Sequence, residues 1–193
     1  MAPQTPKGLT ELLAALAPAQ GRLSLEFCSD NGQCGATSLH VDEIAKIRIT
    51  SSVSGQLILV DEDAAHSLTP LIPNTFAAAS AQGWVKAGQP ILFPEPEYKF
   101  QIQGQAPTGK SRLIAIVAPP GADLSAYAGS TAIKSKGSRS SFGPTPGSDS
   151  ADAYAAQLGN QIVSLAMPGG STNTSLPGWG VAVLNYEILA KSP

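Results

Sequence analysis

The residues with the most recognisable chemical pattern lie at 104–111. They read Gly-Gln-Ala-Pro-Thr-Gly-Lys-Ser and satisfy the phosphate-loop consensus at every position. A phosphate loop binds its ligand because its amides lie at the N-terminus of a helix, where the dipole favours negative charge. The following residues, 112–117, include three β-branched side chains and run into Pro119, which predicts a strand and not a helix. We therefore expect a hairpin loop between two antiparallel strands. Nucleotide binding or hydrolysis through Gly104–Ser111 is the alternative function.

Histidine and acidic residues are the other candidates for chemistry. The sequence contains no nucleophile elbow of the Gly-x-Ser-x-Gly type to accompany His40 and His66, so we expect surface or hydrogen-bonded histidines. The acidic run Asp61-Glu62-Asp63 lacks the loop and the distal carboxylate of a calcium hand, which predicts an exposed, solvated turn. The sequence thus predicts no catalytic residue, no metal ligand and no cofactor. We expect this chain alone not to be an enzyme.

The sequence contains two cysteines, Cys28 and Cys34, and the five residues between them have Asn31-Gly32 at their centre. This spacing suits a tight loop that is closed by a disulfide bond. Two free thiols in a reducing compartment are one alternative, and half of a zinc site is the other. His40 and His66 do not have the spacing of the missing zinc ligands, so we expect the disulfide.

Charge and hydropathy restrict the partners of the chain. Its 12 basic and 14 acidic residues give a net charge of −2, and no basic cluster is strong enough for binding to a phosphate backbone, so we expect no nucleic-acid partner. No run of 18 apolar residues occurs, so we expect no transmembrane helix. Residues 1–6 have the composition of a linker and no signal-peptide pattern. We expect the chain to be the C-terminal part of a longer protein.

The elements that must position these residues are mostly strands. Between residues 47 and 117, apolar runs with a period of two are separated by Gly, Pro, Asn and Asp. This pattern is typical of an all-β protein, mainly an antiparallel β-sandwich or a partly closed barrel, with two or three short helices. Alternation predicts that four side chains face one core: Ile58, Val60, Ile114 and Ile116.

Composition divides the chain into two parts. Residues 1–21 are predicted to be a linker with a short helix at Glu11–Ala17, and residues 22–193 a single β-rich domain. The segment 129–150 is rich in Ser, Gly, Lys and Pro, which predicts a flexible insertion. The expected strands lie at 22–27, 38–41, 44–53, 56–60, 67–72, 91–93, 98–103, 111–118, 161–167 and 180–188.

Three aromatic residues, Trp84, Tyr98 and Trp179, could together form a platform for a ligand. Only 6% of the residues are aromatic, and large aromatic side chains usually anchor a core. We expect these three to be core anchors.

The order of short motifs from residue 44 to about 120 resembles a bacterial family, domain of unknown function family 4384. That family is similar in its strand ending in Asp, its Pro-Asn corner, its Ala-Gly turn and its Pro-x-Gly before a last apolar strand. The matching motifs here are Gly55–Asp61, Leu71–Asn74, Val85–Gly88, Ile91–Pro94, Pro107–Gly109 and Leu113–Ile116.

The resemblance implies a non-catalytic accessory or binding module. Members often follow caspase-like peptidase domains or belong to other cell-envelope proteins, so the partner implied is the upstream domain of the same polypeptide, another protein or cell-wall material. Together with the cysteine pair, it implies a periplasmic or secreted location. The loops of the rigid sheet are then the expected contact surface, with these candidate residues: Asp61, Glu62, Asp63, Pro73, Asn74 and Phe76.

Overall fold

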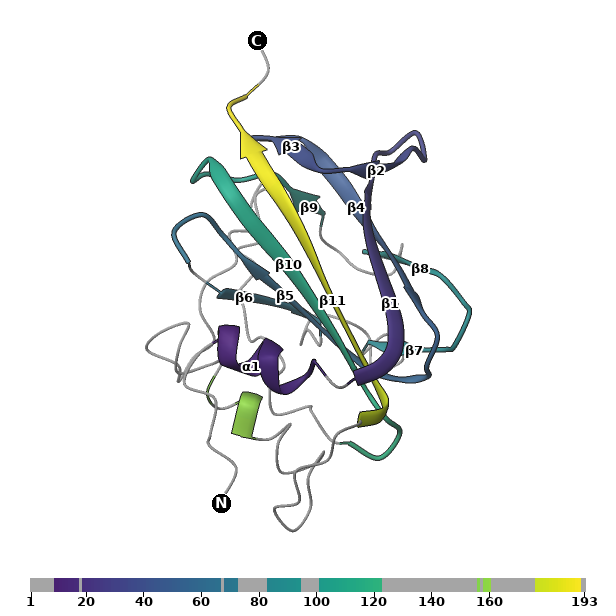
Figure 1. Ribbon diagram of the computed structural model, residues 1–193. Coiled ribbons are helices and arrows are strands. Elements are labelled where there is room, and N and C mark those ends of the chain that lie inside the picture. The colour runs from purple at the N-terminus through teal and green to yellow at the C-terminus, as the bar shows by residue number, and fades with distance from the viewer. Residues whose placement is uncertain are drawn as a thin grey trace.

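A computed structural model describes residues 9–17, 19–66, 68–72, 83–94, 101–122, 156, 158–160 and 176–191 (Figure 1). Several predicted features lie outside these residues. They are the insertion at 129–150, the strand at 161–167, Tyr98, and the candidate contact residues Pro73, Asn74 and Phe76.

The described part of the chain contains the α-helix α1 (Leu9–Ala15), a short helical segment at 158–160, and eleven strands. The strands are β1 (Ala19–Cys28), β2 (Cys34–Ala36), β3 (Ser38–His40), β4 (Ile44–Ser51), β5 (Gly55–Glu62), β6 (Leu68–Ile72), β7 (Trp84–Val85), β8 (Ile91–Phe93), β9 (Ile102–Gln103), β10 (Gly109–Ala118) and β11 (Leu176–Leu189).

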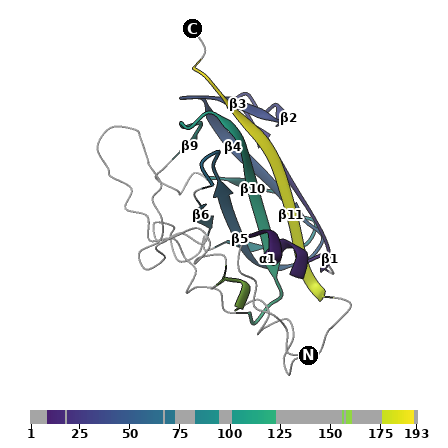
Figure 2. The same cartoon turned by 60° about the vertical axis from the view of Figure 1, so that its left-hand side comes forward.

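These strands form one curled sheet, a half-barrel, in the order β6-β5-β10-β11-β1-β4-β8 (Figures 1 and 2). The short strands β2, β3, β7 and β9 pair with β1, β11, β5 and β4. Most pairs are antiparallel, whereas β1 and β3 run parallel to β11. The prediction of an all-β, mainly antiparallel fold with few and short helices is confirmed.

Strand β1 produces the curl because it pairs with different neighbours along its length. Its first part, from Ala19 to Arg22, pairs with β11, and a register shift lies within it. Its second part, from Leu23 to Cys28, pairs with β4. The strand was predicted to begin at Arg22; it begins at Ala19 because β11 supplies hydrogen-bonding partners that the local sequence does not reveal.

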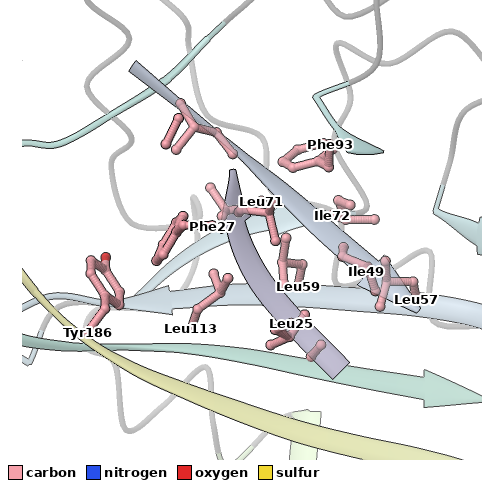
Figure 3. Packing of buried hydrophobic residues seen from close by; sticks show 14 of the residues in the cluster. Leu25, Phe27, Ile49, Leu57, Leu59, Leu71, Ile72, Phe93, Leu113 and Tyr186 are labelled. Atoms are coloured by element: carbon pink, nitrogen blue, oxygen red, sulfur yellow. The ribbon is translucent and has the colours of Figure 1, made fainter. Parts of the chain in front are cut away.

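The concave face of the sheet encloses the larger core. Side chains from strands on both sides of β1 meet there, including Phe27 of β1, Ile47 and Ile49 of β4, Leu59 of β5 and Leu113 of β10. Figure 3 shows this packing, with Tyr186 at one end of the labelled cluster. The rings of Phe27 and Tyr186 meet edge to face at a centroid distance of 4.9 Å, a favoured geometry for aromatic pairs.

The convex face carries a second apolar cluster. Ile58, Val60, Ile114 and Ile116 all belong to it, so the prediction that they face one core is confirmed. Leu12 and Leu16, from α1 and the turn after it, complete the cluster together with Trp179 and other side chains. Because both faces of β5 and β10 are covered, their apolar runs are nearly continuous.

Of the three aromatic residues expected in the core, Trp179 is buried in the convex cluster and confirms the expectation. For Trp84 the expectation was wrong. Its side chain is 52% exposed, because β7 consists of two residues at the margin of the sheet and the alternate position, Val85, points inward.

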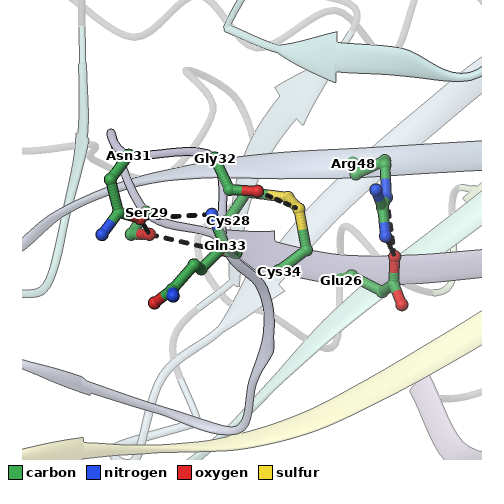
Figure 4. The surroundings of a disulfide bond; sticks show 8 residues. All are labelled: Glu26, Cys28, Ser29, Asn31, Gly32, Gln33, Cys34 and Arg48. Atoms are coloured by element: carbon green, nitrogen blue, oxygen red, sulfur yellow. Dashed lines mark hydrogen bonds and ion pairs between the residues drawn. A yellow bond between two sulfur atoms is a disulfide. The ribbon is translucent and has the colours of Figure 1, made fainter.

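A disulfide bond joins Cys28 to Cys34, as predicted, and closes the turn between β1 and β2 (Figure 4). Within the turn, the amides of Ser29 and Gly32 donate to the carbonyls of Gln33 and Ser29, each at 2.9 Å. Gly32 has a φ of 83°, which is readily available to glycine. Next to this turn, Arg48 and Glu26 form a cross-strand ion pair.

Candidate functional site

The acidic run belongs to a strand and not to an exposed turn, which corrects the prediction. Strand β5 continues to Glu62, because its last residues pair with both β6 and β10. Alternation along β5 therefore sends Asp61 to the concave face and Glu62 to the convex face. Glu62 is buried, and only Asp63 lies beyond the strand.

On the concave face, Asp61 and Tyr186 are joined by a hydrogen bond. The phenol of Tyr186 donates to Oδ1 of Asp61 at 2.7 Å. The bond crosses the intervening strand β10, where Ser111 pairs with Tyr186 and Leu113 pairs with Asp61. Three adjacent strands, β5, β10 and β11, thus bring Asp61, Ser111 and Tyr186 together.

Burial changes the acidity of this pair. Loss of hydration raises the pKa of Asp61 from its usual 3.8 to about 6, although the hydrogen bond from Tyr186 acts in the opposite direction. The neighbouring carboxylates Asp63 and Glu62 add to the increase. Burial and the charge of Asp61 raise the pKa of Tyr186 far above its ordinary value, so the phenol remains a hydrogen-bond donor. At neutral pH, Asp61 is mostly ionised.

The hydroxyl of Ser111 makes no hydrogen bond of ordinary geometry with the described residues, although Ser111 is only 3% exposed. It lies near the phenol of Tyr186 and acts to lower the pKa of that group. An unsatisfied buried polar group costs about 1–3 kcal/mol. Such groups are uncommon in folded proteins and call for an explanation, which is often a binding or catalytic role. Ser111 is therefore the residue that distinguishes this region from an ordinary core.

Ser111 lies on the wall of a cavity of about 150 Å³, which we call the polar cavity. Among the described residues, its polar lining is formed by Asp61, Asp63, Thr69, Gln103, Gly104, Gln105, Ser111 and Tyr186. Its apolar lining is formed by Phe27, Leu39, Ile47, Leu71, Ile102, Ala106, Leu113 and Ile188. A concave site with an apolar wall and a few convergent polar groups is the usual form of a small-molecule site.

The loop that resembles a phosphate loop borders this cavity. Two backbone hydrogen bonds fix Gly104 at the start of the loop. The amide of Gly104 donates to the carbonyl of Glu43, and the carbonyl of Gly104 accepts from the amide of Asp42, both at 2.9 Å. A side chain at Gly104 would place Cβ at 2.2 Å from the carbonyl oxygen of His40, so glycine is required by the close approach. After Gly109 the chain continues as strand β10, so the helix that a phosphate loop needs is not there.

The expectation of a hairpin at this loop was wrong. Strand β9, before the loop, pairs with β4, whereas β10, after it, pairs with β5 and β11. The loop crosses from one side of the curled sheet to the other, because the flanking strands satisfy their hydrogen bonds with different neighbours. This crossing places residues 103–106 over the polar cavity.

A second polar group lies on the convex face, directly behind the cavity. Arg112 donates from Nε to Oε2 of Glu62 at 2.6 Å, and Nδ1 of His66 lies 2.9 Å from Oε1 of the same carboxylate. Both oxygens of Glu62 therefore have partners. These residues line an open groove together with Lys110 and Glu187, and three residues of the cavity wall, Asp63, Ser111 and Tyr186, also reach this groove.

Of the two histidines considered as candidates, His40 has a structural contact. Nδ1 of His40 lies 2.7 Å from the carbonyl oxygen of Ala190, so His40 fixes the end of β11. Within the described ranges, no cluster of three His, Cys, Asp or Glu side chains has an arrangement that could hold a metal ion. In the same part of the chain, no helix is both long and apolar enough to cross a membrane.

Comparison with known proteins gives one match. Residues 38–120 match the family model described as Domain of unknown function (DUF4384). The family resemblance of the sequence motifs is thereby confirmed over these residues. Neither the curated proteins nor the solved structures give a match to the chain. The DUF4384 segment extends from β3 to β10 and contains Asp61 and Ser111, whereas Tyr186 lies outside it on β11.

Ser111 and Tyr186 were not predicted as site residues, and one signal for Ser111 was present. In the predicted strand at 111–118, Ser111 is in phase with Leu113, Ala115 and Val117, which places a polar side chain on an apolar face. For Tyr186, no local signal existed, because its partner Asp61 is 125 residues away.

Proposed function

We propose that the chain is a non-catalytic accessory module that binds a small chemical group in the polar cavity. The observation that carries the proposal is the buried hydroxyl of Ser111, a residue of the cavity wall, which makes no hydrogen bond of ordinary geometry with the described residues. A ligand that reaches the cavity supplies that partner and offsets the desolvation cost.

A binding role suits these groups better than a catalytic one. A serine nucleophile needs a base within hydrogen-bond reach, and no described residue accepts a hydrogen bond of ordinary geometry from the Ser111 hydroxyl. Asp61 is directed to Tyr186, and His66 is directed to Glu62 on the opposite face. The nucleotide alternative has less support, since Lys110 and Ser111 lie on a strand.

The accessory part of the proposal concerns the parent protein. The match to the DUF4384 family supports a module attached to a larger protein, such as a caspase-like peptidase or another cell-envelope protein. The disulfide bond is compatible with an oxidising compartment and so supports a periplasmic or secreted location. In this proposal, the cavity of the module binds a chemical group that belongs to a partner protein or to the module's own upstream domain.

The cavity is tested by screening a mixed library of small cationic, neutral and anionic fragments against the whole chain by NMR. We expect at least one fragment to shift the amides of Asp61, Ser111 and Tyr186 together. Ser111→Val, which removes the hydroxyl and narrows the cavity, abolishes the response, while Ser24→Val on the exposed side of β1 keeps it. A library without any hit at these amides would contradict the binding role.

The accessory role is tested in the full-length protein. Deleting residues 19–193 is expected to change partner binding, localisation or the activity of the upstream domain. Unchanged behaviour in all three measurements would leave the accessory role without support, whatever the cavity binds.

A further inference from the structure

The described part of the lining of the polar cavity carries charge of one sign. Among the described residues, two carboxylates, Asp61 and Asp63, line the cavity, and no lysine, arginine or histidine does. The two bases that flank Ser111 in the sequence, Lys110 and Arg112, alternate with it along β10, so their side chains lie on the convex face. Arg112 is paired with Glu62 there. Such a cavity attracts a cation and repels phosphates and carboxylates.

The size and the depth of the cavity restrict the rest of the ligand. A cavity of about 150 Å³ accommodates a ligand the size of benzene, about six heavy atoms. Much of its described lining is aliphatic or aromatic, including Phe27, Ile47 and Leu113, beside the uncharged polar side chains of Gln103 and Gln105. The matching ligand has a short aliphatic body and a charged head.

The hydrogen-bonding groups restrict the head. Oδ1 of Asp61 accepts from Tyr186, so its carboxylate still has acceptor capacity at Oδ2. The Ser111 oxygen is a second acceptor. An ammonium group has three donors and no acceptor, and it is compact, whereas a guanidinium is planar and larger.

We propose that the polar cavity binds a primary ammonium group on a short aliphatic chain, with Asp61 as its counter-ion and Ser111 as a hydrogen-bond acceptor. This inference rests on the proposed function and names its ligand class. Two kinds of ligand have such a group: the lysine side chain of a protein partner, with its four-carbon stem, and a free alkylamine.

The test compares three probes of equal length on the intact chain: pentylammonium, 1-pentanol and pentanoate. By NMR titration, we expect pentylammonium to bind at least roughly tenfold more tightly than pentanol, as a charge-assisted hydrogen bond requires, and pentanoate to give no response. Asp61→Asn keeps an acceptor for Tyr186 and removes the charge, so it brings the two affinities within about threefold of each other. Asp30→Asn, at an exposed site in the disulfide turn, keeps the preference.

Equal binding of pentanol and pentylammonium to the unmodified chain would overturn the ammonium assignment while the binding module stands. The comparison among probes needs no variant, so a folding defect in Asp61→Asn does not affect it. Failure of every probe, together with failure of the fragment library, would instead remove the proposed function. A blocked lysine tripeptide then separates the sources: binding at least as tight as that of pentylammonium assigns the site to a protein partner, and weaker binding assigns it to a free amine.

Discussion

The two faces of the sheet, at the end where β5 stops and β10 begins, use similar residues in opposite ways. On the convex face, Glu62 has a partner at each oxygen, Arg112 and His66. On the concave face, Asp61 has one bond to Tyr186 and sits beside the unpaired Ser111. Polar groups whose bonds are complete stabilise the fold, whereas those left incomplete next to a cavity are available to a ligand. The following predictions test this difference.

The largest effect is expected on the convex face. Arg112→Met removes the guanidinium partner of the buried Glu62 and lowers the free energy of unfolding by about 3 kcal/mol, because the buried carboxylate keeps only its contact with His66. Arg48→Met is the matched control, since the side chains of Arg48 and Glu26 are 44% and 41% exposed; we expect it to cost under about 1 kcal/mol. Denaturant unfolding measures both, and equal losses would mean that Glu62 does not depend on its pairing.

The second effect concerns pH and the concave face. The pKa of Asp61 in the folded chain is about 6, above its usual 3.8, so between these values the folded state binds more protons than the unfolded state. Asp61 therefore makes stability fall as pH rises from about 4 to 6, by about 1.5 kcal/mol for a partly buried group. The free energies of unfolding of wild type and Asp61→Asn, measured across this range, should converge at its low-pH end, where Asp61 is uncharged like asparagine. A stability that rises across the window equally in both proteins would contradict the burial of this carboxyl.

A smaller effect of opposite sign is expected at Ser111. Ser111→Ala removes an unsatisfied hydroxyl and raises the free energy of unfolding by about 1 kcal/mol. Ser51 is the matched control, because it is equally buried but its hydroxyl donates to the carbonyl of Val53 at 2.6 Å. Ser51→Ala should lower stability by about 1 kcal/mol. Calorimetry that finds both variants destabilised alike would show that Ser111 is satisfied after all.

The smallest effect is expected at Lys110. It pairs in register with Glu187 on the convex side and lies on a strand, so Lys110→Ala should leave ATP turnover at the background of the buffer, as in the unmodified chain. Turnover in the unmodified chain that disappears in the variant would restore the nucleotide function.

Local sequence patterns located the long strands to within a few residues at their ends, and they identified one of the two cores. Alternation correctly placed Ile58, Val60, Ile114 and Ile116 together, and the spacing of Cys28 and Cys34 indicated their disulfide. These features depend on neighbours along the chain, where periodicity and turn chemistry operate.

The candidate site was less accessible to prediction. Asp61 was assigned to a turn because an acidic triplet resembles one, whereas pairing with β6 and β10 extends the strand through Glu62. The contact of Asp61 with Tyr186 joins residues 125 positions apart, and no local pattern encodes it. Long-range pairing decided both outcomes.

The strand β1 has a consequence for the time course of folding. It lies between β4 and β11, and its partner β11 begins at Leu176, more than a hundred residues later in the chain. During synthesis, β1 therefore emerges early and keeps one edge unpaired until almost the whole sequence is available. Contacts of such high sequence separation slow folding and prolong the exposure of a strand edge. For a chain with this topology, the most vulnerable period is the interval between the emergence of its first strand and that of its last.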